Sequence, residues 1–385
     1  PLSYPPKFPQ RDGVSSEPYR RVLIPCGETG GNRAIDGPDV PFLFSFCKAR
    51  SAFVRYFCPS RGAALTGSKS DRPLRIVCVG AAHVDRIARS DSPFRARASN
   101  PGQLAERAGG AVLNAARALV RWGCDVTLVS ARGGDASALL VEAELEALGI
   151  VDYGMAWLDR ASASYTAILD DSGELVAGIA DMAIYEKLTA RVLQRRHIRE
   201  MLQTADALLV DANLPAATLE AIGAMARCPV GAIAVSPAKV VHLRNLLPDL
   251  HLLFASQTEA RQLASQDPMA SVARTCDALH ALSLRHAVVT NGPEGVTVME
   301  NGALTLVEPP RLTQVRDVTG AGDTLAAIGF AAFLAGTPLP EAARLGTAAA
   351  ALHITTGLPP IDAASACRAL AHRSPEPVSI AKAHS

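Results

Sequence analysis

Short strand-like segments and helical segments alternate along most of this chain, and this alternation limits its possible folds more than any other feature. The strand-like runs are Leu74–Gly80, Asp125–Ser130, Ala207–Asp211, Ala232–Val235, Leu252–Ala255 and Ala287–Thr290. The helical stretches between them include Ala111–Trp122, Ser137–Leu148, Ala216–Ala226 and Asp277–Leu284. Such alternation predicts an α/β fold, with a mostly parallel central sheet flanked by helices on both faces.

One region interrupts the alternation. Three strand-like pieces, Tyr153–Leu158, Tyr165–Asp170 and Leu175–Ala180, follow one another with no helix between them. Asp171, Ser172 and Gly173 offer a hairpin turn between the last two pieces. We therefore expect a small antiparallel sheet, with strands around residues 153–182, that projects from the main sheet as a flap.

The two ends of the chain differ from its centre. Residues 1–72 are rich in Pro, Gly, Ser and Arg and show no sustained periodicity. This composition predicts a mostly disordered N-terminal extension, and its acidic residues argue against a typical transit peptide. We expect the folded domain to span residues 73–372 and a flexible tail to follow over residues 373–385.

The composition excludes several classes of function. The 385 residues carry a net charge of +1, so bulk attraction to nucleic acid or to a membrane surface is not expected. No apolar run reaches the length of a membrane span. The eight cysteines are scattered without a Cys-x-x-Cys pair, as is typical of free thiols in a reducing cytosol. These features favour a cytoplasmic location.

The segment Asp317–Thr324 places two glycines and an alanine directly before an aspartate, at the start of an apolar helical run. The backbone N–H groups of Gly320, Ala321 and Gly322 would lie at a helix N-terminus, where they can bind an anion such as a phosphate. Asp323 can be interpreted as a first-turn acid that stabilises the helix. It can also be a general base beside a phosphate site, as phosphoryl transfer to an alcohol requires.

A second carboxylate follows the first predicted strand. Asp85 lies five residues after Gly80, and its two oxygens could accept hydrogen bonds from a diol. A glycine after a strand could also open a dinucleotide-binding fold, but the required Gly-x-Gly-x-x-Gly pattern is absent.

A pair of glycines precedes an alanine-rich helix. Gly109 and Gly110 would let a ligand approach the backbone closely, and Asn114 lies one turn inside the helix. Arg117 and Arg121 continue the same side of the helix, and we expect them to face solvent. The alternative interpretation is an ordinary helix start with a polar flank.

These segments together resemble the signatures of the ribokinase-like (PfkB) family of sugar and nucleoside kinases, over roughly residues 74–358. The resemblance implies a ribokinase-like fold in which the flap is a lid over the sugar. The substrate-binding residues that it implies are Asp85, Gly109, Gly110 and Asn114. It also implies that Asp323 is the catalytic base and that Gly320, Ala321 and Gly322 form an anion hole.

The same resemblance implies an ATP-binding half with a magnesium ion. Thr290, Gly292 and Gly295 match the family segment that lines the nucleotide. Glu259 matches an acidic residue of the Mg-ATP network, an indirect metal role, whereas Ser256 replaces the usual asparagine beside it.

Two positions leave alternatives open. His83 stands where the family usually has asparagine, so it is either a polar substrate contact or a local hydrogen bonder. Asp317 can hold a monovalent cation such as K⁺, as in some relatives, or it can be an ordinary solvated acid.

Three further stretches look like those of pseudouridine kinases, namely Ser99–Gly102, Ala180–Glu186 and Val210–Pro215. The implied reaction is phosphorylation of the 5′-hydroxyl of a ribonucleoside, pseudouridine first, with Asn100 and Asp181 as candidate contacts to the base. Alternatives are a kinase of ribose, a ketohexose or adenosine, and a catalytically silent nucleoside-binding regulator. The partner is then a small molecule, and members of this family often pair into homodimers through the lid.

Overall fold

The structure is a computed structural model that describes residues 72–312, 314–356, 363–372 and 374–380, which belong to one compact unit of residues 60–385. Except for Arg72, the predicted N-terminal extension lies outside the described residues. Arg72 forms an ion pair with Asp206 at 2.6 Å, close to the predicted start of the domain.

Ten strands of the described residues form one sheet in the order β16-β15-β14-β13-β12-β11-β10-β1-β4-β6. They are β1 (Arg75–Val79), β4 (Asp125–Val129), β6 (Val151–Asp152), β10 (Ala207–Asp211), β11 (Val230–Ile233), β12 (Leu252–Ser256), β13 (His286–Thr290), β14 (Val296–Glu300), β15 (Ala303–Val307) and β16 (Val378–Ile380). Pairing is parallel from β6 to β13 and antiparallel from β13 to β16. The predicted α/β fold with a mostly parallel sheet is therefore confirmed.

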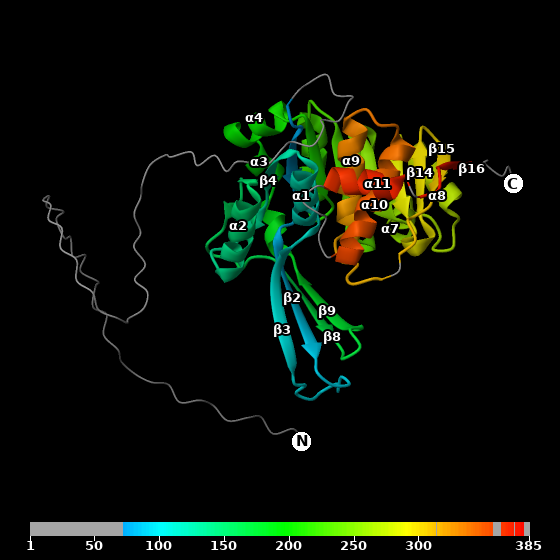
Figure 1. Cartoon of the computed structure of the whole chain (residues 1–385). Coiled ribbons are helices and arrows are strands. Elements are labelled where there is room, and N and C mark those ends of the chain that lie inside the picture. Colours follow the sequence, from blue (N-terminus) through cyan, green and yellow to red (C-terminus); the bar gives the residue numbers. More distant parts are fainter. Residues whose placement is uncertain (1–71, 313, 357–362, 373, 381–385) are drawn as a thin grey trace, which may run out of the picture. The chain divides into compact units, whose positions relative to one another are not determined.

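Helices cover both faces of this sheet (Figure 1). They are α1 (Ala111–Trp122), α2 (Ala136–Leu148), α3 (Ala190–Leu193), α4 (Arg196–Thr204), α5 (Ala216–Met225), α6 (Pro237–Val240), α7 (Gln257–Leu263), α8 (Val272–Ala281), α9 (Ala321–Leu334), α10 (Leu339–Thr356) and α11 (Ala363–Ala371). Strand β1 shows how two cores form, because Ile76 and Cys78 pack toward α1, α9 and α10 while Val77 and Val79 pack toward the opposite face. None of the helices in the described ranges is long and apolar enough to cross a membrane.

A smaller, four-stranded sheet projects from the helix-covered body (Figure 1) and is called the lid below. Its strands, in spatial order, are β3 (Gly102–Gly109), β2 (His83–Ser90), β8 (Ser164–Leu169) and β9 (Leu175–Asp181). The last two match the predicted strand-like pieces, joined by the predicted turn. The prediction that Tyr153–Leu158 belongs to this sheet was wrong, because its strand β7 (Met155–Ala156) pairs with β5 (Ala131–Arg132) outside the lid.

The other two lid strands were missed, and for β3 the reason is physical. Six consecutive residues of β3, from Gly102 to Arg107, are exposed on a thin projecting sheet. A strand that buries neither face carries no alternation of apolar and polar residues, so the period-2 signal is absent. The residues directly before the double glycine are therefore one of the four lid strands.

The described part of the C-terminal segment also differs from the prediction. Residues 373–385 were expected to form a flexible tail, yet β16 pairs with β15, with Leu304 opposite Ile380. Helix α8 begins at Val272 rather than at Asp277, because Ser271 caps it by accepting a hydrogen bond from the Arg274 N–H.

Helix α9, which begins at the glycine-rich motif, is held by a close crossing with α10. A Cβ atom on Gly346 would lie 2.6 Å from the Leu325 carbonyl oxygen and 3.2 Å from the Gly329 nitrogen. Only glycine leaves room for this approach of two helix backbones. The crossing fixes the position of the first turn of α9, where Asp323 lies.

Candidate active site

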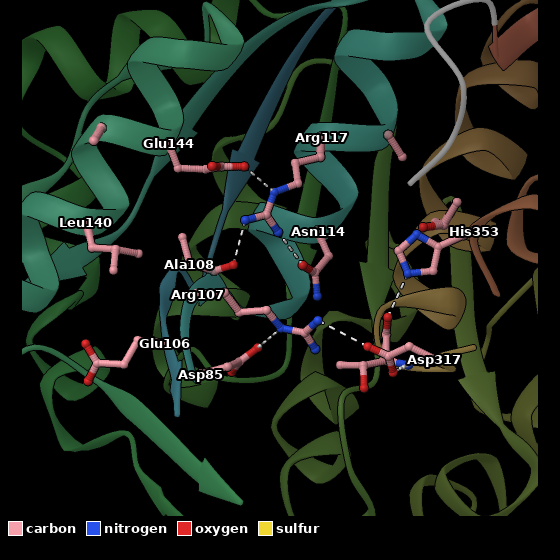
Figure 2. Close-up of a pocket in the computed structure, with 14 residues that line it drawn as sticks. Asp85, Glu106, Arg107, Ala108, Asn114, Arg117, Leu140, Glu144, Asp317 and His353 are labelled. Atoms are coloured by element: carbon pink, nitrogen blue, oxygen red, sulfur yellow. Dashed lines mark hydrogen bonds and ion pairs between the residues drawn. The ribbon is translucent and has the colours of Figure 1, made fainter. Parts of the chain in front are cut away.

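A cavity of about 540 Å³ lies where the base of the lid meets α1, α2 and the segment that leads into α9 (Figure 2). Three residues that the sequence singled out line it, namely Asp85, Asn114 and Asp317. Arg107 from β3 and Arg117 from α1 line it as well, although neither of them was predicted to belong to the site.

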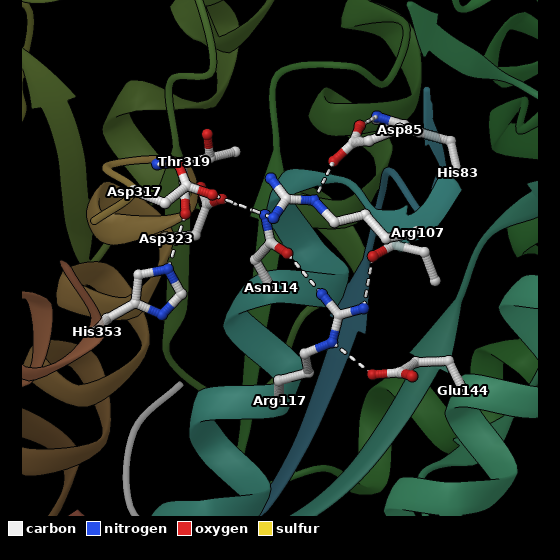
Figure 3. Close-up of polar contacts among 11 residues, drawn as sticks. His83, Asp85, Arg107, Asn114, Arg117, Glu144, Asp317, Thr319, Asp323 and His353 are labelled. Atoms are coloured by element: carbon white, nitrogen blue, oxygen red, sulfur yellow. Dashed lines mark hydrogen bonds and ion pairs between the residues drawn. The ribbon is translucent and has the colours of Figure 1, made fainter. Parts of the chain in front are cut away.

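A continuous chain of hydrogen bonds crosses this site from α2 to α9 (Figure 3). Asn114 Nδ2 donates to Asp323 Oδ2 at 2.9 Å, which joins two motifs 209 residues apart. Arg117 Nη1 donates to Asn114 Oδ1 at 2.7 Å, and Arg117 Nε donates to Glu144 Oε1 at 2.7 Å. The double-glycine motif before α1 and the glycine-rich motif before α9 are therefore in direct contact.

Arg117 determines which way the Asn114 carboxamide faces. A guanidinium group only donates hydrogen bonds, so it must meet the oxygen of the amide, and the NH₂ group then faces the Asp323 carboxylate. Arg117 is itself fixed by a third bond, from Nη2 to the Ala108 carbonyl oxygen at 2.6 Å. The prediction that Arg117 faces solvent was wrong, because α2 and β3 pack beside this face of α1 and supply acceptors.

Asp85 is buried at the base of the lid among polar partners. His83 Nε2 lies 3.3 Å from Asp85 Oδ1, and His83 Nδ1 lies 3.2 Å from the Tyr185 hydroxyl. His83 is thus a buried local hydrogen bonder that links Asp85 to Tyr185.

The double glycine makes room for these two side chains. A Cβ atom on Gly109 would lie 2.1 Å from Asp85 Oδ2, and one on Gly110 would lie 3.1 Å from His83 Nδ1. Gly110 also has a φ of 105°, which side chains rarely allow. Gly109 therefore leaves room for the Asp85 carboxylate at the entrance to α1, and Gly110 leaves room for the Ala81 carbonyl oxygen, 2.5 Å from where a Cβ atom would lie.

Arg107 bridges the lid to the glycine-rich motif. Its Nε lies 3.8 Å from Asp85 Oδ2, and its Nη1 donates to Asp317 Oδ2 at 3.1 Å. Burial works toward a higher pKa for Asp317, but hydrogen bonds from Thr319 and Arg107 outweigh it and lower the pKa of that carboxyl. Asp317 already has a cationic partner, so the geometry offers little support for a monovalent cation at this position.

Asp323 has the electrostatic character of a base that works near neutral pH. Burial is the main cause that raises its pKa to about 7, and the negative charges of Asp211, Asp85 and Glu259 raise it further. The hydrogen bond from Asn114 acts in the opposite direction by stabilising the ionised form. A pKa near the working pH is what efficient general base catalysis requires.

The first turn of α9 carries the predicted anion site. Gly320 is its N-cap, with a φ of 81°, and a Cβ atom there would lie 3.2 Å from Asn114 Nδ2. The Ala321 N–H already donates to the Val318 carbonyl oxygen at 3.1 Å. The N–H groups of Gly322 and Asp323 lie in the first turn, where a helix offers no acceptor of its own.

The predicted nucleotide residues gather at the carboxyl ends of two neighbouring strands. Thr290 ends β13, and Gly292 and Gly295 form the turn into β14 with φ values of 54° and 108°. Ser256 ends β12 and caps α7, where its N–H donates to Glu259 Oε2 at 2.7 Å. Ligands of open α/β sheets bind at such ends.

A magnesium ion fits this set of residues as a companion of bound phosphates. The described residues hold no group of three or more His, Cys, Asp or Glu side chains that could bind a metal by themselves. Mg²⁺ needs only one or two carboxylates in addition to phosphate oxygens and water. The carboxylates that together raise the pKa of Asp323, Glu259 among them, form a negative field that a divalent cation would neutralise.

The two candidate base contacts do not line the described cavity. Asn100 lies in the β2–β3 loop, where its carboxamide accepts from the Arg95 N–H at 2.8 Å and donates to the Arg95 carbonyl oxygen at 2.9 Å. Asp181 is exposed at the end of β9 and pairs in register with Ser164, which places it on the face of the lid opposite Asp85.

Comparisons with known proteins identify the family of the chain. Residues 74–361 match the model of the pfkB family of carbohydrate kinases. The chain belongs to that family. It is therefore an ATP-dependent sugar or nucleoside kinase with a ribokinase-like fold.

Its relatives include two proteins of Escherichia coli strain K12. The chain is 29% identical to a pseudouridine kinase over 70% of its own length and 87% of that protein. It is 30% identical to an uncharacterised sugar kinase, YeiI, over 73% of its length and 78% of that protein.

Solved structures give the same fold. A carbohydrate kinase from Agrobacterium tumefaciens is 37% identical, with a TM-score of 0.72 over 80% of this chain and 100% of the other. Arabidopsis thaliana ribokinase complexed with ribose and ATP is 20% identical, with a TM-score of 0.67 over 78% of this chain and 99% of the other.

We expect Asp323→Asn to lower kcat by roughly 10²- to 10⁴-fold, because the general base is lost. In the parent enzyme kcat/KM should fall as pH decreases through about 7, where Asp323 becomes protonated. Steady-state assays between pH 5 and 9 would measure both effects. A variant within a few-fold of the parent would show that Asp323 is only a first-turn acid of α9.

The melting temperature provides an independent check of the same residue. Folding raises the pKa of Asp323 from 3.8 to about 7, so the folded state favours the protonated carboxyl and loses stability as pH rises through that range. Asp323→Asn should therefore melt at a higher temperature than the parent at pH 8, with a difference that shrinks toward pH 4. If Asp323 were only an acid that stabilises the helix, Asp323→Asn would melt at a lower temperature than the parent at pH 8.

We expect Arg117→Met to move the acidic limb of the kcat/KM profile to higher pH, by about one unit. Without the guanidinium group the Asn114 amide can turn its oxygen toward Asp323, and the bond that favours the ionised carboxylate is lost. Arg117→Lys keeps the positive charge, so its acidic limb should lie between those of the parent and of Arg117→Met. An unchanged pH profile with a lower melting temperature would mean that Arg117 only supports the fold.

Proposed function

We propose that the protein transfers the γ-phosphoryl group of ATP to the 5′-hydroxyl of a ribonucleoside, with pseudouridine as its preferred acceptor. The observation that carries this proposal is the hydrogen bond between Asn114 and Asp323, which places a base with a pKa of about 7 beside the cavity that Asp85 lines. Asp85 can then bind the diol of a ribosyl group while Asp323 faces the primary hydroxyl of the same group.

Each residue has a defined task in the proposed reaction. Asp85 accepts hydrogen bonds from two ribose hydroxyls, and His83 and Arg107 hold its carboxylate in place. Asp323 takes the proton of the 5′-hydroxyl as that oxygen attacks the phosphorus atom.

The anion site stabilises the phosphoryl group while it is transferred. The first-turn N–H groups of α9 face the charge that spreads over its oxygens, together with the positive end of the helix dipole. Mg²⁺ bound with ATP would add positive charge there, held on the protein side through Glu259 and water.

The charge of the cavity supports a neutral acceptor rather than a sugar phosphate. Four carboxylates line it, from Asp85, Glu106, Glu144 and Asp317, against the two guanidinium groups of Arg107 and Arg117. Both guanidinium groups are already engaged by these carboxylates. An anionic substituent on the acceptor would therefore meet net repulsion.

Pseudouridine is favoured over other ribosyl compounds by the three stretches that look like pseudouridine kinases and by the 29% identical relative. Pseudouridine carries its base on a carbon–carbon bond, which frees one more ring N–H than uridine has. A site that pairs this N–H would disfavour uridine, because its polar group would stay unpaired.

We expect kcat/KM for pseudouridine to exceed that for uridine, adenosine, ribose and fructose in a coupled ATPase assay over all five compounds. Preference for ribose or a hexose would contradict the nucleoside assignment and leave the kinase family unaffected. ATP turnover that none of the five stimulates would favour a silent nucleoside-binding regulator.

We also propose that two copies of the chain pair through the outer face of the lid. Leu104 and Ile179 lie on the face opposite Asp85 and are 65% and 68% exposed, an unusual exposure for large apolar side chains. Light scattering should give a dimer mass for the parent and a monomer mass for Leu104→Glu. A monomeric parent would contradict this pairing.

A further inference from the structure

The face of the lid that carries Asp85 is defined by the register of its four strands. Arg107, Asp85, Tyr165 and Ala180 are successive partners across β3, β2, β8 and β9. Residues that pair in register point to the same side of a sheet. Asp85 and Arg107 line the cavity, so this side, called the inner lid face, is turned toward the substrate, and Tyr165 lies on it directly beside Asp85.

The ring of Tyr165 lies flat on this face. A Cβ atom added to Gly178 of β9 would lie 2.5 Å from the Tyr165 hydroxyl oxygen, 3.2 Å from Cζ and 3.3 Å from Cε2. The ring edge therefore passes directly over the Gly178 backbone. Gly178 has no positive φ, so its backbone conformation does not require glycine. Glycine is required there because a side chain would occupy the space of the Tyr165 ring.

The surroundings of the ring are small and apolar. The row of the inner lid face next to Asp85 consists of Ala105, Ile87, Ala167 and Gly178. Tyr165 is partly exposed, with Ala180 beside it on β9. Next to the Asp85 carboxylate the inner lid face thus presents a partly exposed aromatic ring among apolar residues that offer few hydrogen bonds.

We propose that Tyr165 is the platform on which the heteroaromatic base of the acceptor nucleoside stacks. This inference rests on the proposed function, because it needs the ribose hydroxyls at Asp85. In a nucleoside the base is attached to the ribose carbon next to the diol, so a ribose held by Asp85 carries its base over the neighbouring strand.

Stacking on an aromatic side chain suits any planar base and needs no hydrogen-bond partner on the floor. A free sugar would instead turn hydroxyl groups toward apolar residues and would leave the ring uncovered. The inner lid face therefore favours nucleosides as a class, whereas discrimination between pseudouridine and uridine belongs to other groups.

The experiment compares steady-state constants of the full chain and its variants, with pseudouridine, uridine and ATP each varied in turn. Tyr165→Ala and Tyr165→Leu should raise KM for both nucleosides roughly ten- to hundred-fold, the usual effect of losing an aromatic partner of one base. Both should leave KM for ATP and kcat within a few-fold of the parent. Tyr165→Phe, which keeps the ring and loses the hydroxyl, should match the parent.

Two further variants separate stacking from sheet stability, since an aromatic ring over a glycine also stabilises a strand. Gly178→Val places a side chain where the ring rests, so it should raise the nucleoside KM although Tyr165 is retained. Thr166→Ala, at the next position of β8 but on the outer face, should leave KM unchanged. Melting temperatures identify any variant that has lost its fold, and Tyr165→Leu still covers Gly178 if Tyr165→Ala does not fold.

The outcomes distinguish this proposal from the proposed function. If the parent phosphorylates nucleosides and folded Tyr165→Leu keeps the parental nucleoside KM, the platform is wrong and the proposed function stands. If the parent phosphorylates sugars and no nucleoside, both are wrong.

Discussion

The hydrogen bond between Asn114 and Asp323 is the interaction on which the rest of the site depends. It joins the start of α1 to the start of α9, two elements 209 residues apart in the sequence. The double glycine that admits Asp85 lies at one end of α1, and the close crossing at Gly346 holds α9 against α10. Local features of four separate segments thus converge on a single carboxylate and the amide that faces it.

The electrostatics of the site follow from the same convergence. Burial raises the pKa of Asp323 most, the charges of Asp85, Asp211 and Glu259 raise it further, and a hydrogen bond from Asn114 opposes them. Such crowding destabilises the folded protein when all four groups are ionised, a cost that active sites commonly carry. A divalent cation bound together with the nucleotide would relieve it, so cation binding and the ionisation of Asp323 should be coupled.

The sequence predicted the parts of the fold that leave a repeated apolar pattern. The parallel strands β1, β4, β10, β11, β12 and β13 and helix α1, at Ala111–Trp122, were found because burial on one or both faces imposes that pattern. Strand β3 was missed because its first six residues are exposed and carry no apolar alternation, and β2 was missed together with it. The glycine motifs located Asp85, Asn114 and Asp323. Arg107 was not considered and Arg117 was expected to face solvent, because charged residues on a strand or helix normally do. An arginine three positions after Asn114, on the same side of α1, was the only available signal.

Central to this account is a ribosyl group held at the lid with its primary hydroxyl beside Asp323, and the position of phosphorylation on the product tests it most directly. Proton-coupled ³¹P NMR of the product formed from ATP and pseudouridine would locate the new ester. We expect a triplet, because a phosphate on the 5′-oxygen couples to the two protons of one methylene group. A doublet, which indicates an ester on a ring carbon that bears a single proton, would contradict the arrangement of Asp85 and Asp323 described above.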